Sequence, residues 1–262
     1  MDRLFIGLGV EADWPESFPE GRILEPRNRH LTLVFLGNHT SHRILNELDS
    51  LPVLRKVGLA GYFDSPLFIP PSHPRVVSWH VAMHEGLGHL QAHVAEWIRE
   101  LGYTIDARTF LPHLTIARAP FEVKKWEDHF KPLPWTTDQI HLYRSMGNLQ
   151  YEPLWSHTYL SPIEQIDHPA DFAFLIRGES FKELYFHAIT ALSMACSALI
   201  DPEIPLPKMD NWTSLDGVIE GLNERIAVID GKWGIELKGV PYSHSLRILE
   251  DGVLEWEMIV DV

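Results

Sequence analysis

The sequence predicts an α+β protein built from two domains, residues 1–162 and residues 163–262. Three observations lead to this prediction. Short β-branched runs alternate with segments whose apolar residues recur at helical spacing. The first 160 residues repeat one pattern twice, a helix and strands around a His-x-Thr strand, which predicts two pseudo-symmetric lobes. A fresh pattern then starts after a polar link at residues 161–167.

Size, charge and cysteine content exclude several classes of protein. With 262 residues, 45% of them hydrophobic, the chain can form two cores, and no run approaches the roughly 18 apolar residues of a membrane span. Residues 1–160 carry 15 basic and 18 acidic side chains, whereas the remainder carries 7 and 18. Only the front half therefore suits a polyanionic partner. The single cysteine, Cys196, excludes an internal disulfide and fits a cytoplasmic protein.

The elements of the first lobe follow from periodicity and from turn residues. Apolar residues at helical spacing begin at Ser41 and continue to Leu51, so we expect a helix that stops at Pro52. Pro66 is expected to separate two strands. The predicted strands lie at residues 4–10, 29–37, 57–63, 67–70 and 74–83.

The second lobe repeats this order. A helix over residues 87–101 is expected to end at Gly102, because glycine readily adopts the left-handed conformation that closes helices. Residues 110–118, F-L-P-H-L-T-I-A-R, then form the second His-x-Thr strand, the counterpart of R-H-L-T-L-V-F-L-G at residues 29–37.

The two His-x-Thr pairs are the candidate site. Residues i and i+2 of a strand share a face, so His30 with Thr32 and His113 with Thr115 each present an imidazole beside a hydroxyl. Two such strands facing each other form a cleft in which one imidazole accepts a proton while the other donates one, near neutral pH. The hydroxyls can hold phosphate oxygens without a metal. Either motif alone is more typical of a hydrogen-bonded histidine in an apolar strand; two copies in matched settings favour catalysis.

These motifs resemble those of the two-histidine (2H) phosphoesterases, above all the LigT-like RNA 2′,3′-cyclic phosphodiesterases with their HLTLxFLG and PHxTxAR signatures. The resemblance covers nearly all of residues 1–160 and implies a pseudo-symmetric two-lobed fold. It implies hydrolysis of an RNA 2′,3′-cyclic phosphate to a 2′-phosphate. His30 is then the proton donor to the leaving 3′-oxygen, and His113 is the base that activates water.

The same resemblance implies a set of substrate-binding residues, Thr32, Thr115 and Arg118. Arg118 has the opposite parity to Thr115, so it reaches the phosphate only if the strand bends, and otherwise forms a surface ion pair. Weaker candidates are Arg27 and Arg29 for the RNA backbone, and Trp79 and Phe110 for stacking on a base, although aromatic residues in strands usually belong to the core. The other histidines of this half show no metal-ligand spacing.

The back half predicts a smaller α/β sandwich. Ser180 and Glu183 form a capping box that opens a helix to about residue 199, and a second helix is expected to start at Thr213 or Ser214. Strands are expected at residues 172–177, 233–240 and 254–260.

This half resembles archease, the accessory protein of the GTP-dependent RNA ligase. The resemblance rests on H-P-A-D at residues 168–171, G-E-S-F-K-E-L-Y-F-H-A at residues 178–188 and the final two residues. It implies a divalent cation, usually calcium, held by Asp171, Asp261 and the Val262 main chain; oxygen ligands suit such a hard cation. The alternative is a pair of solvated acids in an acidic domain.

Three positions depart from the archease pattern. Pro169 replaces a threonine, Gly221 replaces a tryptophan, and a histidine is displaced to His244. These changes leave the cation ligands in place but put the partner-docking surface in doubt.

Together the halves predict an RNA-end-processing enzyme, a metal-independent cyclic phosphodiesterase fused to an archease-like module that acts with an RNA ligase in RNA repair or tRNA splicing. The expected partners are RNA 2′,3′-cyclic phosphate ends and the ligase, with no membrane. Two alternatives stay open. One is a non-catalytic ligase cofactor that binds cyclic ends, although arginine would serve binding better than paired histidines. The other is a phosphodiesterase acting on small cyclic nucleotide phosphates.

Overall fold

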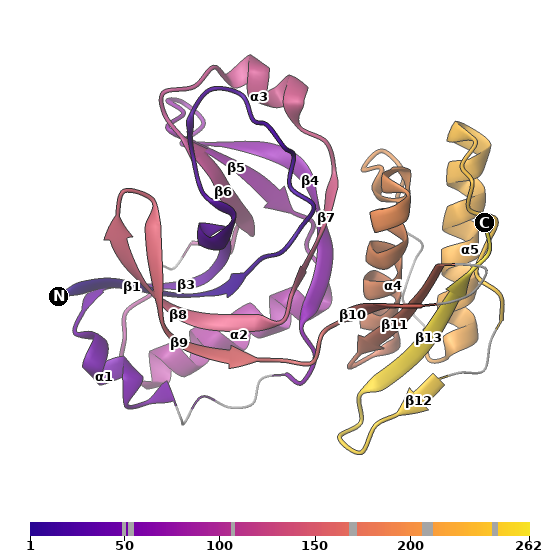
Figure 1. The fold of residues 1–262 in the computed structure, drawn as a ribbon. Coiled ribbons are helices and arrows are strands. Elements are labelled where there is room, and N and C mark those ends of the chain that lie inside the picture. Colours follow the sequence, from indigo (N-terminus) through magenta and orange to yellow (C-terminus); the bar gives the residue numbers. More distant parts are fainter. Residues whose placement is uncertain (49–50, 52–54, 106–107, 168–171, 206–211, 243–245) are drawn as a thin grey trace.

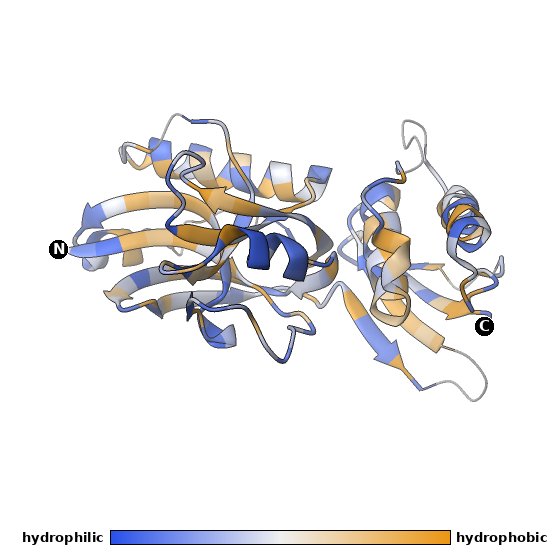
Figure 2. Cartoon of the chain, turned by 90° about the horizontal axis from the view of Figure 1, so that it is seen from above, coloured by the Kyte–Doolittle hydropathy of each residue, from blue (hydrophilic) through white to orange (hydrophobic). Residues whose placement is uncertain are grey.

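The computed structural model describes residues 1–48, 51, 55–105, 108–167, 172–205, 212–242 and 246–262. Two sheets organise these residues, each with a hydrophobic core of its own (Figure 1). Apolar residues run along the strands and the inner helix faces of both units (Figure 2). Within the described residues, every helix is too short or too polar to cross a membrane.

The first sheet joins the described strands in the order β7-β4-β5-β6-β3-β1-β8-β9, with β2 paired to β6. Its strands are β1 (Asp2–Gly9), β2 (Arg22–Ile23), β3 (His30–His39), β4 (Leu59–Ile69), β5 (Val76–Val81), β6 (His113–Arg118), β7 (Leu133–Thr137), β8 (Gln139–Gly147) and β9 (Gln150–Thr158). Its helices are η1 (Pro26–Asn28), a 3-10 turn, α1 (Ser41–Leu45), α2 (Glu85–Glu100) and α3 (Val123–His129). The two His-x-Thr strands, β3 and β6, are thus neighbours at the centre of the sheet, with one lobe on either side.

The two faces of β1 differ in chemistry, and this difference positions the cleft. Leu4, Ile6 and Leu8 alternate along the strand and are buried in the core, to which α2 contributes its apolar face. Phe5, Gly7 and Gly9 fall on the other face. At Gly7 an added side-chain carbon would lie 2.7 Å from the Leu31 carbonyl oxygen, so the glycine allows β3 to approach β1 closely.

Two predictions for the first lobe are wrong in detail. β4 is one strand rather than two. β7 pairs with β4 only as far as Phe63, so at Pro66 the described pairing of β4 is with β5 alone. A strand with one neighbour tolerates a proline, which has no backbone N–H to donate to a second neighbour. α1 ends at Leu45 rather than near Leu51. The bonds that follow are those of tighter turns, because the amide of Glu47 donates to the Ile44 carbonyl and the amide of Leu51 to the Leu48 carbonyl.

The second sheet has the order β10-β11-β13-β12, and all its described pairings are antiparallel. Its elements are β10 (Ile163–Ile166), β11 (Phe172–Gly178), α4 (Phe181–Ala195), η3 (Ser197–Ile200), α5 (Leu215–Trp233), β12 (Leu246–Ile248) and β13 (Leu254–Val260). The helix starts are confirmed, because Ser180 accepts a hydrogen bond from the Glu183 amide and Ser214 accepts one from the Gly217 amide.

Two further predictions are wrong in this unit. The strand expected at residues 233–240 is absent from the described residues, since α5 runs through Trp233 and only Gly239 bridges to Asp261. α4 ends at Ala195, and the 3-10 turn η3 follows it.

The space around Gly221, where archeases have a tryptophan, is occupied by another tryptophan of this chain. A side-chain carbon added there would lie 2.5 Å from the Trp212 ring, so an indole from outside the helix fills the space above the glycine.

A buried ion pair joins the two units. Arg55 donates to both carboxylate oxygens of Glu183, at 3.1 and 3.0 Å, and the two side chains are only 4% and 10% exposed. Around this pair α4 packs against β4 and β7, and the His84 ring lies 5.3 Å from the Phe186 ring. Removing either partner of a buried pair leaves the other charge uncompensated, so this contact holds the units in one arrangement.

Candidate active site

The five residues that the sequence singled out in the front half border one cavity of about 170 Å³. Leu31 of β3 pairs with Leu114 of β6 in an antiparallel register. Continuing that register by one residue on each side sets His30 beside Thr115, and His113 beside Thr32, on one face. The lining residues are Arg3, Phe5, His30, Thr32, Phe35, Ile69, Val76, His113, Thr115, Arg118, Ser145 and Tyr151.

Each imidazole is held by the backbone in the same way. Nδ1 of His30 lies 2.8 Å from the Asn28 carbonyl oxygen, and Nδ1 of His113 lies 2.8 Å from the Leu111 carbonyl oxygen. A carbonyl only accepts, so Nδ1 carries the proton in both rings. Nε2 of each neutral ring is therefore the atom left with a lone pair for proton transfer.

The two rings differ in their surroundings. His30 is enclosed by aromatic rings, with Phe5 stacked at 4.7 Å and Tyr151 edge-on at 4.5 Å between centroids. Burial is the main cause that lowers the pKa of His30 to about 4; the positive charge of Arg118 acts in the same direction, and the hydrogen bond to Asn28 opposes it. No aromatic ring of the described residues stacks on His113, and its side chain is partly exposed. In the empty cleft at neutral pH, His30 is thus a neutral ring.

Arg118 reaches the cavity because β6 bends. The β5–β6 register shifts between Val77 and Ser78, which leaves Ile116 as an extra residue on β6. Such a β-bulge reverses the parity of the residues that follow, so Arg118 and Thr115 border the same cavity. The Nε atom of Arg118 is buried and has no hydrogen-bond partner among the described residues. Of the two possibilities that the sequence offered for Arg118, the structure shows the bend.

The cavity suits an anion. Its described lining residues include two arginines, Arg3 and Arg118, and no carboxylate. The threonine hydroxyls add hydrogen-bond donors, and an imidazole adds one at Nε2 when that atom is protonated. A hard cation prefers carboxylate and carbonyl oxygens, so this donor set fits a phosphate better than a metal.

Sequence reasoning missed several residues of the cavity. Arg3 and Phe5 lie on the face of β1 opposite Leu4, and the alternation D-R-L-F-I-G-L-G could have indicated it. Tyr151 comes from β9, and the side-chain oxygen of Asn28 accepts its amide N–H at 3.0 Å. Nothing in the local sequence signals that long-range contact.

The remaining candidates divide between core and surface. Trp79 is 1% exposed and belongs to the core. Arg29 is buried, donates to the Leu24 carbonyl oxygen and stacks on Trp14. Phe110 borders a cavity of about 400 Å³ that shares Thr32, Phe35, Ile69 and His113 with the histidine cavity.

The predicted cation site lies partly outside the described residues. Asp171 is not among them, nor is the rest of H-P-A-D. Asp261 is exposed and pairs with Gly239 through its backbone. The ammonium group of Lys238 donates to the main-chain oxygen of Val262, the atom assigned to the cation. Within the described chain, no three His, Cys, Asp or Glu side chains gather as metal ligands. Because Asp171 lies outside the described residues, the cation site stays a prediction.

The chain is similar to several solved structures but matches no family model. No family model matches the chain, and no curated protein matches it. Among solved structures, the chain is similar to E. coli LigT complexed with 3′-AMP, at 23% identity and a TM-score of 0.47, over 60% of this chain and 98% of that one. It is also similar to a structure described as a phosphoesterase (21%, 0.47, covering 61% and 99%) and to a Thermus thermophilus protein (21%, 0.47, covering 61% and 98%).

Proposed function

We propose that the front half is a metal-independent RNA-end-processing phosphodiesterase that hydrolyses a 2′,3′-cyclic phosphate to a 2′-phosphate. One observation carries the proposal: His30 and His113 have identically fixed tautomers and border one small cavity whose other polar residues suit an anion. The resemblance of both strand motifs to 2H phosphoesterases supports the choice of substrate.

The reaction uses both rings at once. His113 takes a proton from water, whose oxygen forms a new bond to phosphorus. The bond between phosphorus and the 3′-oxygen breaks, and protonated His30 gives its proton to that oxygen. Thr32, Thr115 and Arg118 hold the non-bridging oxygens, which carry the charge of the transition state. The product is a 2′-phosphate beside a free 3′-hydroxyl.

The lowered pKa of His30 makes its acid role depend on the substrate. A unit negative charge ~4 Å from the ring, at an effective dielectric constant of ~20, stabilises the imidazolium by ~4 kcal/mol. This interaction raises an imidazole pKa by ~3. The pKa of His30 is about 4 in the empty cleft, so binding of the phosphate returns the ring to the range in which it holds a proton near neutral pH. Binding of the substrate thereby favours the protonated form of His30, the proton donor of the reaction.

The cavity beside Phe110 favours a nucleotide over a bare cyclic phosphate. It adjoins the histidine cavity through Thr32 and His113 and combines an aromatic ring with polar side chains. Bases of single-stranded RNA are recognised by aromatic stacking together with hydrogen bonds to their edges. The terminal base of the substrate therefore lies there in our proposal.

The test uses a short 5′-labelled RNA that ends in a 2′,3′-cyclic phosphate, with EDTA present. We expect the wild type to yield a 2′-phosphate, and His30→Ala and His113→Ala to lower the rate by ~10²–10⁴ with unchanged thermal unfolding. His157→Ala, on β9 and outside the histidine cavity, is the matched control. Binding of the cyclic end without turnover would support the ligase-cofactor alternative, and activity abolished by EDTA would contradict the metal-independent mechanism.

For the back half we propose an archease-like role, in which it acts with a GTP-dependent RNA ligase. The motifs quoted above support it, as does the separate sheet with its own core. The full-length chain, with His30→Ala to preserve cyclic ends, should raise the turnover of a cognate ligase. Unchanged ligase turnover over a range of concentrations of this protein would contradict the proposal.

A further inference from the structure

A larger cavity, of about 660 Å³, lies on the same face of the sheet as the histidine cavity. His30 pairs with Gly9, and Phe5 pairs with Tyr143 of β8, so these residues share the concave face. Gly9 and Tyr143 also border the larger cavity, and the Tyr143 ring lies 5.3 Å from the His30 ring. The two cavities are thus consecutive along one surface.

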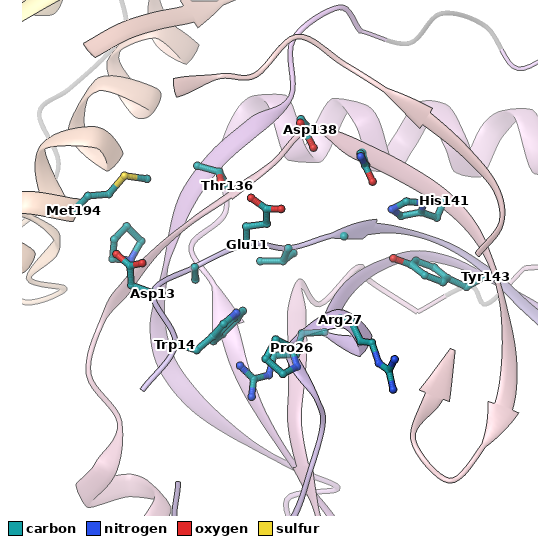
Figure 3. A pocket seen from close by; sticks show the side chains of 16 residues that line it. Glu11, Asp13, Trp14, Pro26, Arg27, Thr136, Asp138, His141, Tyr143 and Met194 are labelled. Atoms are coloured by element: carbon teal, nitrogen blue, oxygen red, sulfur yellow. The ribbon is translucent and has the colours of Figure 1, made fainter. Parts of the chain in front are cut away.

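The larger cavity contains polar atoms that the proposed reaction does not use. Figure 3 shows the His141 ring and the Tyr143 hydroxyl pointing into it. A side-chain carbon added at Gly9 would lie 3.1 Å from Nε2 of His141 and 3.6 Å from the Tyr143 hydroxyl, so both polar groups lie close against this glycine. His141 is only 8% exposed, and its Nδ1 is held by the Ser156 hydroxyl at 2.7 Å.

The rest of the lining is aromatic on one side and acidic on another. Trp14 supplies an indole ring beside the buried Arg29. Glu11, Asp13 and Asp138 place three carboxylates on the lining of the cavity (Figure 3). Carboxylates repel phosphate but accept hydrogen bonds from base amino groups and ribose hydroxyls. This end of the surface therefore suits a nucleoside rather than a phosphate group.

The turn η1 connects the two cavities. Pro26 and Arg27 border the larger one. The Asn28 carbonyl oxygen holds His30, and the Asn28 side chain holds the Tyr151 backbone at the smaller one. Arg27 is exposed, and its side chain pairs with Glu25 at 2.7 Å. A cationic side chain at this crossing suits a phosphodiester that passes from one cavity to the other.

Size argues that a substrate extends beyond the histidine cavity. Ligand sites typically occupy ~300–1,000 Å³, whereas the histidine cavity has about 170 Å³, enough for the phosphate and part of its sugar. The cavity at Phe110 is open to the terminal base, which leaves the larger cavity for what precedes it in the strand.

We propose that the larger cavity binds the nucleoside immediately 5′ to the cyclic-phosphate nucleotide of a single-stranded RNA. Its base stacks on Trp14, His141 and Tyr143 hydrogen-bond to its edge or its 2′-hydroxyl, and the linking phosphate passes Arg27. This inference rests on the proposed function and names the substrate as an oligonucleotide. Met194 of α4 borders the same cavity, so the second unit also adjoins this subsite.

A length series of substrates tests the inference. Hydrolysis is measured in EDTA for a mononucleoside 2′,3′-cyclic phosphate and for di- and trinucleotides with the same cyclic end. We expect kcat/KM to rise about 5- to 150-fold from mono- to dinucleotide, the range that one stacked base contributes, and to change little from di- to trinucleotide. In His141→Ala this gain should shrink at least about fivefold, whereas in His157→Ala it should persist.

The outcomes separate the two proposals. Hydrolysis of the mononucleotide with no gain for the dinucleotide overturns this inference and leaves the proposed function standing. A gain that His141→Ala leaves intact also overturns it. Hydrolysis of none of the substrates overturns the proposed function and this inference together. Where His141→Ala fails to fold, Tyr143→Phe removes the second polar group of the cavity while keeping the ring, and the gain should shrink in that variant as well.

Discussion

Two pairs of histidines can be compared in this protein, His30 with His113 at the cleft and His84 with His187 at the junction between the units. The cleft pair borders a cavity, whereas the junction pair is buried. Burial lowers the pKa of His30 to about 4 at the cleft, and it lowers those of His84 and His187 to about 3 and about 4 at the junction between the units. At the junction His84 is 5% exposed and His187 is 0% exposed.

The difference between the pairs lies in access and in the neighbouring charges. The junction rings lie beside an ion pair that is already satisfied, Arg55 with Glu183. The cleft rings face a cavity with two arginines and no carboxylate among its described lining residues. A perturbed pKa therefore indicates burial at both places, but it indicates chemistry only where an anion can enter.

Breaking the junction gives the largest expected change in stability. We expect Glu183→Gln to lower the free energy of unfolding by about 3–5 kcal/mol, because Arg55 is left as a buried, uncompensated charge. Hydrolysis of a cyclic phosphate by the folded fraction should stay within about twofold of the wild type. Urea denaturation and initial rates check the two halves of this prediction.

The matched control for that variant replaces both partners, with Arg55→Met and Glu183→Leu together. It should recover most of the lost stability, since apolar residues of similar size often replace a buried ion pair without loss. A single variant that unfolds no more easily than the wild type would mean that the pair contributes little. A folded variant without activity would mean that the junction takes part in the chemistry.

Acid should destabilise the protein through histidines whose pKa is lowered in the folded state, above all His30, His84 and His187, and His141 acts in the same direction. The unfolded chain protonates each histidine near its ordinary pKa of 6.5, whereas the folded pKa values of His30, His84 and His187 are about 4, about 3 and about 4. The unfolded state therefore binds more protons as pH falls below 6.5, and stability declines until the pH passes the folded pKa values. At pH 5 the loss is about 2 kcal/mol for each ring.

Denaturation at pH 7 and at pH 5 measures that loss. His84→Phe places an apolar ring beside Phe186 and should reduce the loss by about one third. An unchanged loss in this variant would show that His84 does not titrate in the way the junction geometry requires.

Local signals predicted part of this architecture well. Gly102 ends its helix with φ of +80°, Ser180 caps α4, and both His-x-Thr strands form where β-branched residues alternate. These features depend on neighbours within a few residues, and the sequence displays those directly. Long-range features could not be predicted in the same way.

The bend in β6 that brings Arg118 to the cavity arises from the pairing of β6 with β5. The aromatic rings that enclose His30, Phe5 and Tyr151, come from the two ends of the first unit. Pro66 inside β4 is possible only because β7 stops at Phe63. Each of these depends on which strands become neighbours, and the periodicity of a single segment does not contain that information.

The most direct test of the central claim is a titration of histidine ring resonances by NMR, in the free protein and with adenosine 2′-monophosphate. We expect the pKa of His30, about 4 in the free protein, to rise by ~2–3 when the phosphate binds. His84 and His187 should titrate as before, because no anion reaches them. A pKa of His30 that stays unchanged on phosphate binding, or one that moves no more than those of the junction rings, would contradict the claim that the cleft pair is distinguished by its access to an anion.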